Sequence, residues 1–258
     1  MRILFSKYQG TGNDFIIIDN RNGHIRLTKE QIGVLCNRRF GIGADGLMLL
    51  NSNADYDFEM KYYNADGQEG SMCGNGGRCL IRFAYDCGIH KDAYSFIASD
   101  GPHQAFIGNN RWIHLKMKDV DKIESFNHDY LVDTGSPHYI KQVQDLDSLN
   151  VFSEGHAIRN SQPFAEKGIN VNFVEPQPNH LKVRTFERGV EDETYSCGTG
   201  VTAAALVFAH NDNGFNRVNI ETKGGNLAVE FQKNGEQQFE NIWLCGPAVF
   251  VFNGEIDV

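Results

Sequence analysis

The segment MCGNGGRC, from Met72 to Cys79, and the segment SCGTG, from Ser196 to Gly200, each place Cys-Gly-x-Gly immediately before an apolar run. Their cysteines, Cys73 and Cys197, are separated by almost half of a chain of 258 residues. A cysteine followed by small residues is compatible with a redox site, a metal ligand, a nucleophile or a packed turn. The surrounding sequence has to decide among these roles.

The sequence around the two cysteines is repeated in the same order. Asn64 precedes Cys73 by the same number of positions as Arg188 precedes Cys197, and each follows strand-like sequence. The repeated segments, first copy and then second, are TGNDF (11–15) and TGSPH (134–138), FEMKYYN (58–64) and LKVRTFER (181–188), GGRCLIRFAYDCG (76–88) and VTAAALVFAHNDNG (201–214), and YSFIASDG (94–101) and VNIETKGG (218–225). This order indicates an internal duplication.

Each half is expected to contain many short strands and one mostly buried helix that begins at Cys-Gly-x-Gly and stops at a glycine. Shorter helices are predicted at 27–39, where Thr28 can cap the helix, and around 151–160. The predicted class is α+β with strand dominating, in two pseudo-symmetric lobes. Further strands are predicted at DFIIID (14–19), GLMLLN (46–51), HQAFIG (103–108), RWIHLKM (111–117), GINVNFV (168–174), NLAVEFQ (226–232) and AVFVFNGEI (248–256).

The boundary between the lobes is predicted near the charged segment KMKDVDKIES (116–125). This gives an amino-terminal lobe over 1–118 and a second lobe over 119–247. Duplication places equivalent points of the two halves opposite each other, and small-molecule sites favour such interfaces. The active site is therefore expected between the lobes.

The composition favours a globular protein that acts on a small molecule. Hydrophobic residues make up 41% of the chain and charged residues 22%, and the formal net charge is -9. An acidic chain without a basic block is a poor candidate for binding nucleic acid or an anionic membrane surface. No segment approaches the ~20 apolar residues of a membrane span, and MRILFSKYQG lacks the apolar segment of a signal peptide, so a cytoplasmic location is expected.

The cysteines are too sparse for a disulfide scaffold. The six cysteines include no Cys-x-x-Cys pair, which argues against thioredoxin and zinc-ribbon sites and favours free thiols without a bound metal. Cys79 aligns with Ala203 in the duplication, and Cys36, Cys87 and Cys245 have no paired counterpart. These four cysteines are expected to be packing residues.

Cys73 and Cys197 differ from the other cysteines because the duplication retains both. A cysteine at a helix start lies at the positive end of the helix dipole, which favours a thiolate near neutral pH. The small residues after each cysteine leave backbone amides open to an anion. Two such helix starts facing each other would hold one carboxylate and place a sulfur on either side of its α-carbon. Inversion at a carbon requires a base on one face and an acid on the other.

The segment GIGADG (41–46) has the spacing G-x-G-x-x-G of a dinucleotide-binding turn. That fingerprint needs a strand before it and a helix after it. Here a predicted helix precedes the segment and a predicted strand follows it. We therefore expect a glycine-rich turn and no nucleotide cofactor.

Four motifs in order resemble the diaminopimelate epimerase family, and the resemblance covers nearly the whole chain. It implies an enzyme that interconverts LL- and meso-diaminopimelate without pyridoxal phosphate or another cofactor, in the biosynthesis of lysine and peptidoglycan precursors. It also implies that each lobe is a strand barrel around a central helix, and that the last strand (248–258) returns to the amino-terminal lobe. The motifs are QGTGNDF (9–15), YNADGQEGSMCGNGGRC (63–79), GIN (168–170) and FERGVEDETYSCGTG (186–200).

The same resemblance implies roles for individual residues. Cys73 and Cys197 match the two acid/base cysteines of the family. The other matching positions are the α-carboxylate site at the amides after each cysteine (Gly74, Asn75, Gly198 and Thr199), the distal end of the substrate (Asn64, Asn170 and Arg188), and the surroundings of the reacting centre (Asn13 and Glu187, with His138 and Ser136 assisting).

Two positions depart from the family pattern. Some members carry Gln where Gly46 stands, and many carry Asn where Ser136 stands, so recognition of the substrate amine stays open. His138 is equally compatible with a packing role, and Arg188 with a surface ion pair to Glu187.

Two other functions also stay open. Proline racemases and hydroxyproline epimerases resemble this fold and use paired cysteines, but their cyclic substrates have no second carboxylate for an arginine to bind. A non-catalytic thiol protein, either a redox sensor or a zinc-stabilised binding module, would bind metal or form a regulatory disulfide and would turn over no amino acid. The sequence is compatible with a homodimer but does not fix the oligomeric state.

Overall fold

The structure, a computed structural model, describes residues 1–258 and divides into two compact units. Unit 1 comprises Met1–Leu115 and Gly246–Val258, and unit 2 comprises Lys116–Cys245. The observed boundaries, after residues 115 and 245, lie close to the predicted boundaries after residues 118 and 247. No helix combines the length and the apolar character needed to cross a membrane.

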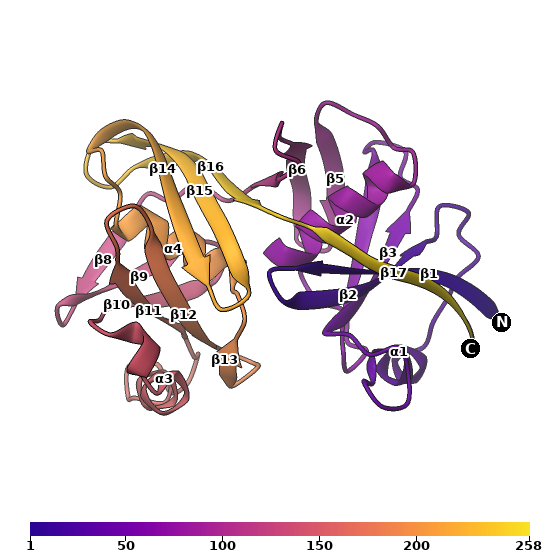
Figure 1. The fold of residues 1–258 in the computed structure, drawn as a ribbon, viewed down its shortest axis with the longest axis horizontal. Coiled ribbons are helices and arrows are strands. Elements are labelled where there is room, and N and C mark those ends of the chain that lie inside the picture. Colours follow the sequence, from indigo (N-terminus) through magenta and orange to yellow (C-terminus); the bar gives the residue numbers. More distant parts are fainter. The chain divides into compact units, whose positions relative to one another are not determined.

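Unit 1 is built from a mixed sheet and two helices (Figure 1). Its elements are β1 (Arg2–Gly10), β2 (Asn13–Asp19), α1 (Lys29–Cys36), β3 (Gly46–Asn51), β4 (Phe58–Asn64), α2 (Gly74–Asp86), β5 (Tyr94–Ala98), β6 (Gly101–Ile107), β7 (Ile113–Lys116) and β17 (Val249–Asp257). From β1 to β7, successive strands pair antiparallel, parallel, antiparallel, parallel, antiparallel and antiparallel. β17 pairs antiparallel with β1, which confirms that the last strand returns to the first unit.

Unit 2 repeats this arrangement. Its elements are β8 (Ile123–Phe126), β9 (Asp129–Asp133), β10 (Pro137–Gln142), η1 (Leu146–Ser148), α3 (Val151–Arg159), β11 (Asn170–Pro176), β12 (Leu181–Glu187), β13 (Asp192–Thr194), α4 (Gly198–Val207), β14 (Asn213–Thr222), β15 (Gly225–Asn234) and β16 (Phe239–Gly246). The pairings β9–β10, β10–β11, β11–β12, β12–β14, β14–β15 and β15–β16 follow the same order of antiparallel and parallel contacts as in unit 1. The internal duplication is thereby confirmed at the level of strand topology.

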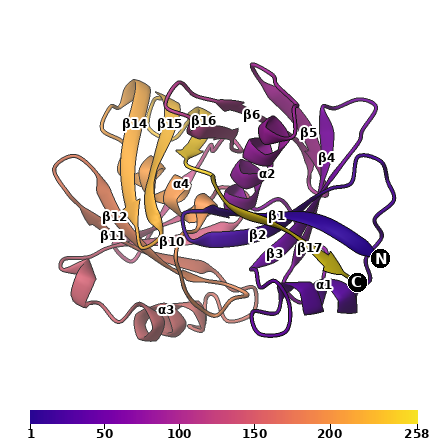
Figure 2. The same ribbon diagram turned by 45° about the vertical axis from the view of Figure 1, so that its right-hand side comes forward.

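A buried helix lies at the centre of each unit. α2 contacts β1, β2, β3 and β17, and Figure 2 shows it surrounded by the strands of unit 1. α4 contacts β9–β12, β14 and β15 in the same manner. Residues 74–81 of α2 are all buried, and in α4 only Thr199 and Val207 are partly exposed. Because helix and sheet bury each other's apolar faces, each unit is a strand-rich layer around a central helix.

The two smaller helices begin where the sequence predicts them. α1 follows Thr28, whose side chain accepts from the Gln31 backbone while the Gln31 side chain accepts from the Thr28 backbone, so the predicted cap is confirmed as a capping box. α3 follows Asn150, whose side chain accepts from the backbone N–H of Ser153.

One predicted helix end is wrong. α2 ends at Asp86, with Gly88 in the left-handed region at φ +87°, as expected. α4 ends at Val207, well before Gly214. The buried Asn216 side chain accepts from the backbone N–H of Asn211 and donates to its carbonyl. This side chain offers the backbone an alternative to helical hydrogen bonds, so the chain leaves the helix early.

Candidate active site

Cys73 is the N-cap residue of α2, with an extended backbone at φ −97° and ψ 129°. The backbone N–H groups of the first turn, from Gly74 to Gly76, point beyond the helix end because no preceding helical carbonyl can accept them. The thiol, the positive end of the helix dipole and a set of amide donors therefore share one place.

A two-residue hairpin turn brings Asn13 to this helix start. Thr11 and Gly12 both have positive φ, at 50° and 84°, which is the type I′ turn that joins β1 to β2. The Asn13 Oδ1 atom accepts from Asn75 Nδ2 at 3.3 Å and lies 3.7 Å from Cys73 Sγ, a distance suited to an S–H donor. Asn13 thus contacts both the thiol and the second residue after it.

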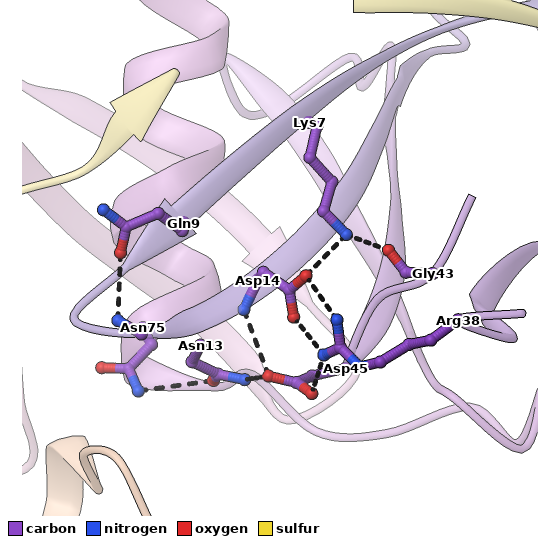
Figure 3. Close-up of polar contacts among 9 residues, drawn as sticks. Lys7, Gln9, Asn13, Asp14, Arg38, Gly43, Asp45 and Asn75 are labelled. Atoms are coloured by element: carbon purple, nitrogen blue, oxygen red, sulfur yellow. Dashed lines mark hydrogen bonds and ion pairs between the residues drawn. The ribbon is translucent and has the colours of Figure 1, made fainter. Parts of the chain in front are cut away.

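Charged side chains to which the sequence analysis assigned no role hold the Asn13 amide in place through hydrogen bonds (Figure 3). Asn13 Nδ2 donates to Asp45 Oδ2 at 2.5 Å, and Arg38 donates to Asp45 Oδ1 at 2.7 Å. Arg38 also makes two hydrogen bonds to Asp14, at 2.6 and 3.0 Å, and Lys7 pairs with Asp14 at 2.7 Å. These side chains form one continuous network beneath the β1–β2 hairpin.

The network controls the charge of Asp14. Burial alone would raise the pKa of the Asp14 carboxyl, but hydrogen bonds from Arg38 and Lys7 outweigh it and lower that pKa to about 2. Lys7 is only 5% exposed and also donates to the carbonyl of Gly43, so its buried ammonium has two acceptors, this carbonyl and the Asp14 carboxylate. Asp14 is therefore ionised at neutral pH, as a buried lysine requires.

Arg78 is a further site residue that the sequence reasoning missed. It is fully buried in α2 and donates to Asn75 Oδ1 at 3.0 Å, Thr11 Oγ1 at 3.2 Å and the Gly74 carbonyl at 3.2 Å. An arginine near the start of a helix that was expected to be mostly buried was the available signal, because a buried arginine must be hydrogen-bonded throughout.

Cys197 occupies the equivalent place in unit 2, as the N-cap residue of α4. Its Sγ lies 3.5 Å from the Thr199 hydroxyl, and either atom can be the donor. Thr134, in the second Thr-Gly turn, donates to the Thr199 carbonyl at 2.9 Å. Thr11 similarly lies 3.5 Å from the Asn75 side chain, so both turns contact the residue two positions after the cysteine.

Asn170 contacts two other predicted residues of unit 2, Arg188 and Ser136. Its Oδ1 accepts from the backbone N–H of Arg188 at 2.9 Å, and its Nδ2 donates to Ser136 Oγ at 2.8 Å and to the Pro137 carbonyl at 3.1 Å. The Arg188 guanidinium donates to the Lys167 carbonyl at 3.1 Å and is otherwise exposed. Asn170 thus orders the chain around Arg188, while the guanidinium is accessible to a ligand.

His138 is completely buried beside Asn172. Burial, followed by the positive charge of Arg188, lowers the pKa of His138 to about 3, so the imidazole is neutral at neutral pH. Asn172 Nδ2 lies 3.1 Å from His138 Nδ1 and can only donate, so the ring proton is on Nε2, which has no hydrogen-bond partner. His138 can act as a neutral donor but not as a charged acid.

The remaining predicted residues lie at strand ends. Asn64 is exposed at the end of β4, with its side-chain amide free of protein hydrogen bonds. Glu187 is half-buried at the end of β12, next to Arg188. At Gly46, where some family members carry Gln, an added Cβ would lie 2.5 Å from the ring of Tyr62, which fills this space.

Three of the other cysteines are poor candidates for chemistry. Burial raises the pKa of the Cys36 thiol to about 11, of Cys79 to about 12 and of Cys87 to about 11. They stay protonated at neutral pH and are weak nucleophiles and weak bases. This agrees with the packing role predicted for them.

Comparison with known proteins supports one family. The sequence profile described as "Diaminopimelate epimerase" matches residues 5–119 and 130–251. A protein of Flavobacterium psychrophilum described by the same name is 47% identical over 256 residues, which cover 97% of this chain and 98% of the relative.

Solved structures of distant sequence share the fold. A Bacillus anthracis phenazine biosynthesis protein of the PhzF family has a TM-score of 0.80 at 18% identity, and the similarity covers 100% of both chains. A hydroxyproline epimerase from Agrobacterium vitis, solved with bound trans-4-hydroxy-L-proline, has a TM-score of 0.66 at 14% identity over 99% of this chain and 92% of that one. At these identities the likeness concerns the fold alone.

Proposed function

Because the chain belongs to the diaminopimelate epimerase family, we propose that it inverts the α-carbon of diaminopimelate, interconverting the LL and meso forms in lysine biosynthesis, with Cys73 and Cys197 as its acid and base. The observation that supports this assignment is that both units contain the same arrangement. In each unit a cysteine is the N-cap residue of a buried central helix, and the backbone N–H groups of the first helical turn have no acceptor within the helix.

The proposed reaction is a proton exchange between two faces of one carbon. One cysteine, as thiolate, takes the α-hydrogen as a proton and becomes a thiol. The other, as thiol, delivers its proton to the opposite face and becomes the thiolate. The electron pair left by the broken C–H bond is held on the carbon and its carboxylate until the new C–H bond forms, so no net oxidation or reduction occurs.

The intermediate carbanion is the costly species, and the chain supplies electrostatic help for it. The first-turn amides of α2 and α4 would hold the α-carboxylate as negative charge spreads onto it. Glu187 would keep the substrate amine protonated, since a positive charge next to the carbanion stabilises it. His138 would assist as a neutral hydrogen-bond donor, because its pKa of about 3 keeps it uncharged.

The far end of the substrate would be bound by Arg188, Asn64 and Asn170. The accessible Arg188 guanidinium suits a carboxylate, and the unbonded Asn64 amide suits a carboxylate or an ammonium. Asn170 would contribute mainly by holding the Arg188 backbone, because both its oxygen and its nitrogen already bond to the protein. We place this reaction in the cytoplasm, where the cysteines stay reduced.

The test is an assay with two substrates. Purified protein is incubated with LL-diaminopimelate or with L-proline under reducing conditions, and the products are separated by chiral chromatography. The proposal predicts conversion to meso-diaminopimelate until the two forms equilibrate, and no D-proline. Racemisation of proline without turnover of diaminopimelate would move the chain to the proline racemase type, and turnover of neither would support a non-catalytic thiol protein.

A further inference from the structure

We propose that two charged side chains, Arg78 and Asp45, act as positioning residues for Cys73. They lie at opposite ends of a hydrogen-bond chain through two amides, those of Asn75 and Asn13. The chain fixes both amides in one orientation, so that an oxygen atom always faces the Cys73 sulfur.

The hydrogen-bond chain runs in one direction, with each donor on the side of the Arg78 cation and each acceptor on the side of the Asp45 anion. Arg78 donates to Asn75 Oδ1 at 3.0 Å, and Asn75 Nδ2 donates to Asn13 Oδ1 at 3.3 Å. Asn13 Nδ2 then donates to Asp45 Oδ2 at 2.5 Å, the last contact being visible in Figure 3. Cys73 Sγ joins the chain at Asn13 Oδ1, 3.7 Å away.

The direction of these hydrogen bonds follows from the donors and acceptors that the two end groups carry. A guanidinium has only donors, so it selects the oxygen of Asn75, and a carboxylate has only acceptors, so it selects the nitrogen of Asn13. Turning either amide by 180° would set two donors or two acceptors against each other at both of its contacts. Each contact of this kind leaves a donor or an acceptor unsatisfied, which is costly where the contact is buried, so the amides have one orientation.

The anionic end is itself held in place. Asp45 Oδ2 also accepts from the backbone N–H of Asp14 at 3.2 Å, and Asp45 Oδ1 accepts from Arg38 at 2.7 Å. The Asp45 backbone N–H donates to the Asp14 carbonyl at 2.9 Å. The carboxylate is therefore clamped on both oxygens, although 42% of the Asp45 side chain is exposed.

Unit 2 has no equivalent of this chain. In the duplication Thr202 stands where Arg78 stands, Thr199 where Asn75 stands, and Ser136 where Asn13 stands. Ile169 precedes β11 where Asp45 precedes β3. Cys197 instead contacts the Thr199 hydroxyl, which can rotate to donate or to accept. The two thiols therefore meet different partners: a fixed acceptor for Cys73 and an adaptable hydroxyl for Cys197.

A fixed acceptor favours Cys73 in its protonated form, since only the S–H can donate to Asn13 Oδ1. The charged groups around this helix start act in both directions. Arg78 in α2 and Lys7 in β1 carry positive charge and favour a thiolate. Asp14 in β2, Asp45 before β3 and Asp100, which accepts from the Met72 backbone N–H at 3.2 Å, carry negative charge and oppose it. The Asn13 amide oxygen lies 3.7 Å from the Cys73 sulfur, and a hydrogen bond at that distance depends on the orientation of the amide.

The experiment measures the thiols directly. Wild type and Asp45→Asn are treated with iodoacetamide across a pH series, and the alkylation rates of Cys73 and Cys197 are followed separately by peptide mass spectrometry. An asparagine at 45 no longer dictates which end of the Asn13 amide it contacts, so Cys73 loses its obligatory acceptor. Its alkylation curve is expected to move to lower pH by roughly half a unit, about a threefold faster reaction at neutral pH, while the curve of Cys197 stays in place.

Two further variants separate positioning from general damage. Arg38→Met keeps Asp45 but removes its clamp, and should shift the Cys73 curve in the same direction by a smaller amount. Asp19→Asn, which removes a carboxylate paired with Arg21 on the same strand as Asn13, should leave both curves unchanged. An unmoved Cys73 curve in Asp45→Asn, or equal shifts at both cysteines, would overturn the proposal.

As a statement about catalysis this inference rests on the proposed function. If the wild type epimerises diaminopimelate, one limb of the pH profile of kcat/KM should move in Asp45→Asn by the same amount as the alkylation curve of Cys73. If the wild type has no such activity, the proposed function fails while the alkylation result still decides the orientation of Asn13.

Discussion

Gly200 leaves the space that the Asn172 side chain needs: a Cβ at position 200 would lie 2.2 Å from Asn172 Oδ1. That amide cannot move freely, because it is fully buried, donates to the Tyr139 carbonyl, contacts His138 and accepts from Thr185. The glycine after Cys-Gly-x is therefore required in unit 2 by a polar cluster under the helix start.

The equivalent glycine in unit 1 is less constrained, which gives a matched pair of variants. A Cβ at Gly76 would meet Met48 Sδ at 3.3 Å, at the flexible end of a side chain. Gly200→Ala is expected to lower the free energy of unfolding by about 2–3 kcal/mol, since it breaks buried hydrogen bonds, and Gly76→Ala by less than about 1 kcal/mol. Urea unfolding of both variants measures this, and equal losses would contradict the account.

The two cysteines should be separately indispensable. Cys73→Ala and Cys197→Ala are each expected to abolish epimerisation of LL-diaminopimelate, since each leaves one face of the α-carbon without an acid or base. The circular dichroism spectrum should stay that of the wild type, because only one sulfur at a helix start is lost. Cys87→Ala is the control: its thiol pKa is raised to about 11, and turnover should persist. Near-normal turnover in either active-site variant would mean that one thiol suffices.

Arg188 should govern the recognition of the second carboxylate. Arg188→Met removes a charge-assisted hydrogen bond worth about 1.5–3 kcal/mol, so kcat/KM for diaminopimelate is expected to fall by roughly ten- to a hundredfold or more. Lys182→Met removes a cation that pairs with Asp147 from β12, the strand that ends just before Arg188, and should change kcat/KM little. Similar losses in both variants would point to a general charge effect rather than to binding at Arg188.

Asp14 should make a pH-dependent contribution to stability. Hydrogen bonds from Arg38 and Lys7 overcome burial and lower its pKa from 3.8 to about 2. A carboxyl whose pKa is lowered by folding stabilises the folded state above its unfolded pKa, and this contribution is lost as the pH falls through the folded pKa. The difference in free energy of unfolding between wild type and Asp14→Asn should therefore be constant above about pH 5 and shrink between about pH 4 and pH 2.

Other carboxylates titrate in the same range, so the difference between two variants is the informative quantity. Asp212→Asn provides the control, because the Asp212 side chain is 99% exposed and should give a difference near zero at every pH. A gap between wild type and Asp14→Asn that stays constant down to pH 2 would show that Asp14 is not held in its ionised form by the fold.

The strands and helix starts could be predicted because they depend on local patterns. GLMLLN is a strand over the predicted residues 46–51, and Thr28 caps α1 because the capping box needs only Thr28 and Gln31. The end of α4 could not be predicted in this way. It depends on the Asn216 side chain reaching back to Asn211, a contact that a helix-stop rule based on glycine does not contain.

In the candidate site, too, the residues in local motifs could be predicted and those that depend on tertiary contacts could not. The cysteines, Asn13 and Arg188 are visible in motifs, whereas Lys7, Arg38 and Asp45 look like ordinary surface charges in the sequence. Their role arises from pairing across the β1–β2 hairpin and the turn before β3, which brings Asp14 and Asp45 to one guanidinium. Arg78 was visible beside Cys79, but only its complete burial shows that it bonds to the neighbouring amide.

The proposed proton exchange has an isotopic signature that mutation cannot provide. A thiol carries a single proton, so one cysteine acting on both faces would tend to return the hydrogen that it removed. Two cysteines separate the tasks, because one takes the α-hydrogen while the other delivers a proton already exchanged with solvent. Neither step requires the removed hydrogen to reach the product.

The reaction should therefore be run from LL-diaminopimelate in deuterium oxide and stopped early, with both isomers isolated and analysed by mass spectrometry. The meso product is expected to carry deuterium at the inverted carbon, because Cys73 or Cys197 delivers it from solvent. The recovered LL substrate should carry almost none, because its hydrogen leaves only on the way to product. Equal early labelling of both isomers, or transfer of the original hydrogen into the product, would rule out separate acid and base cysteines.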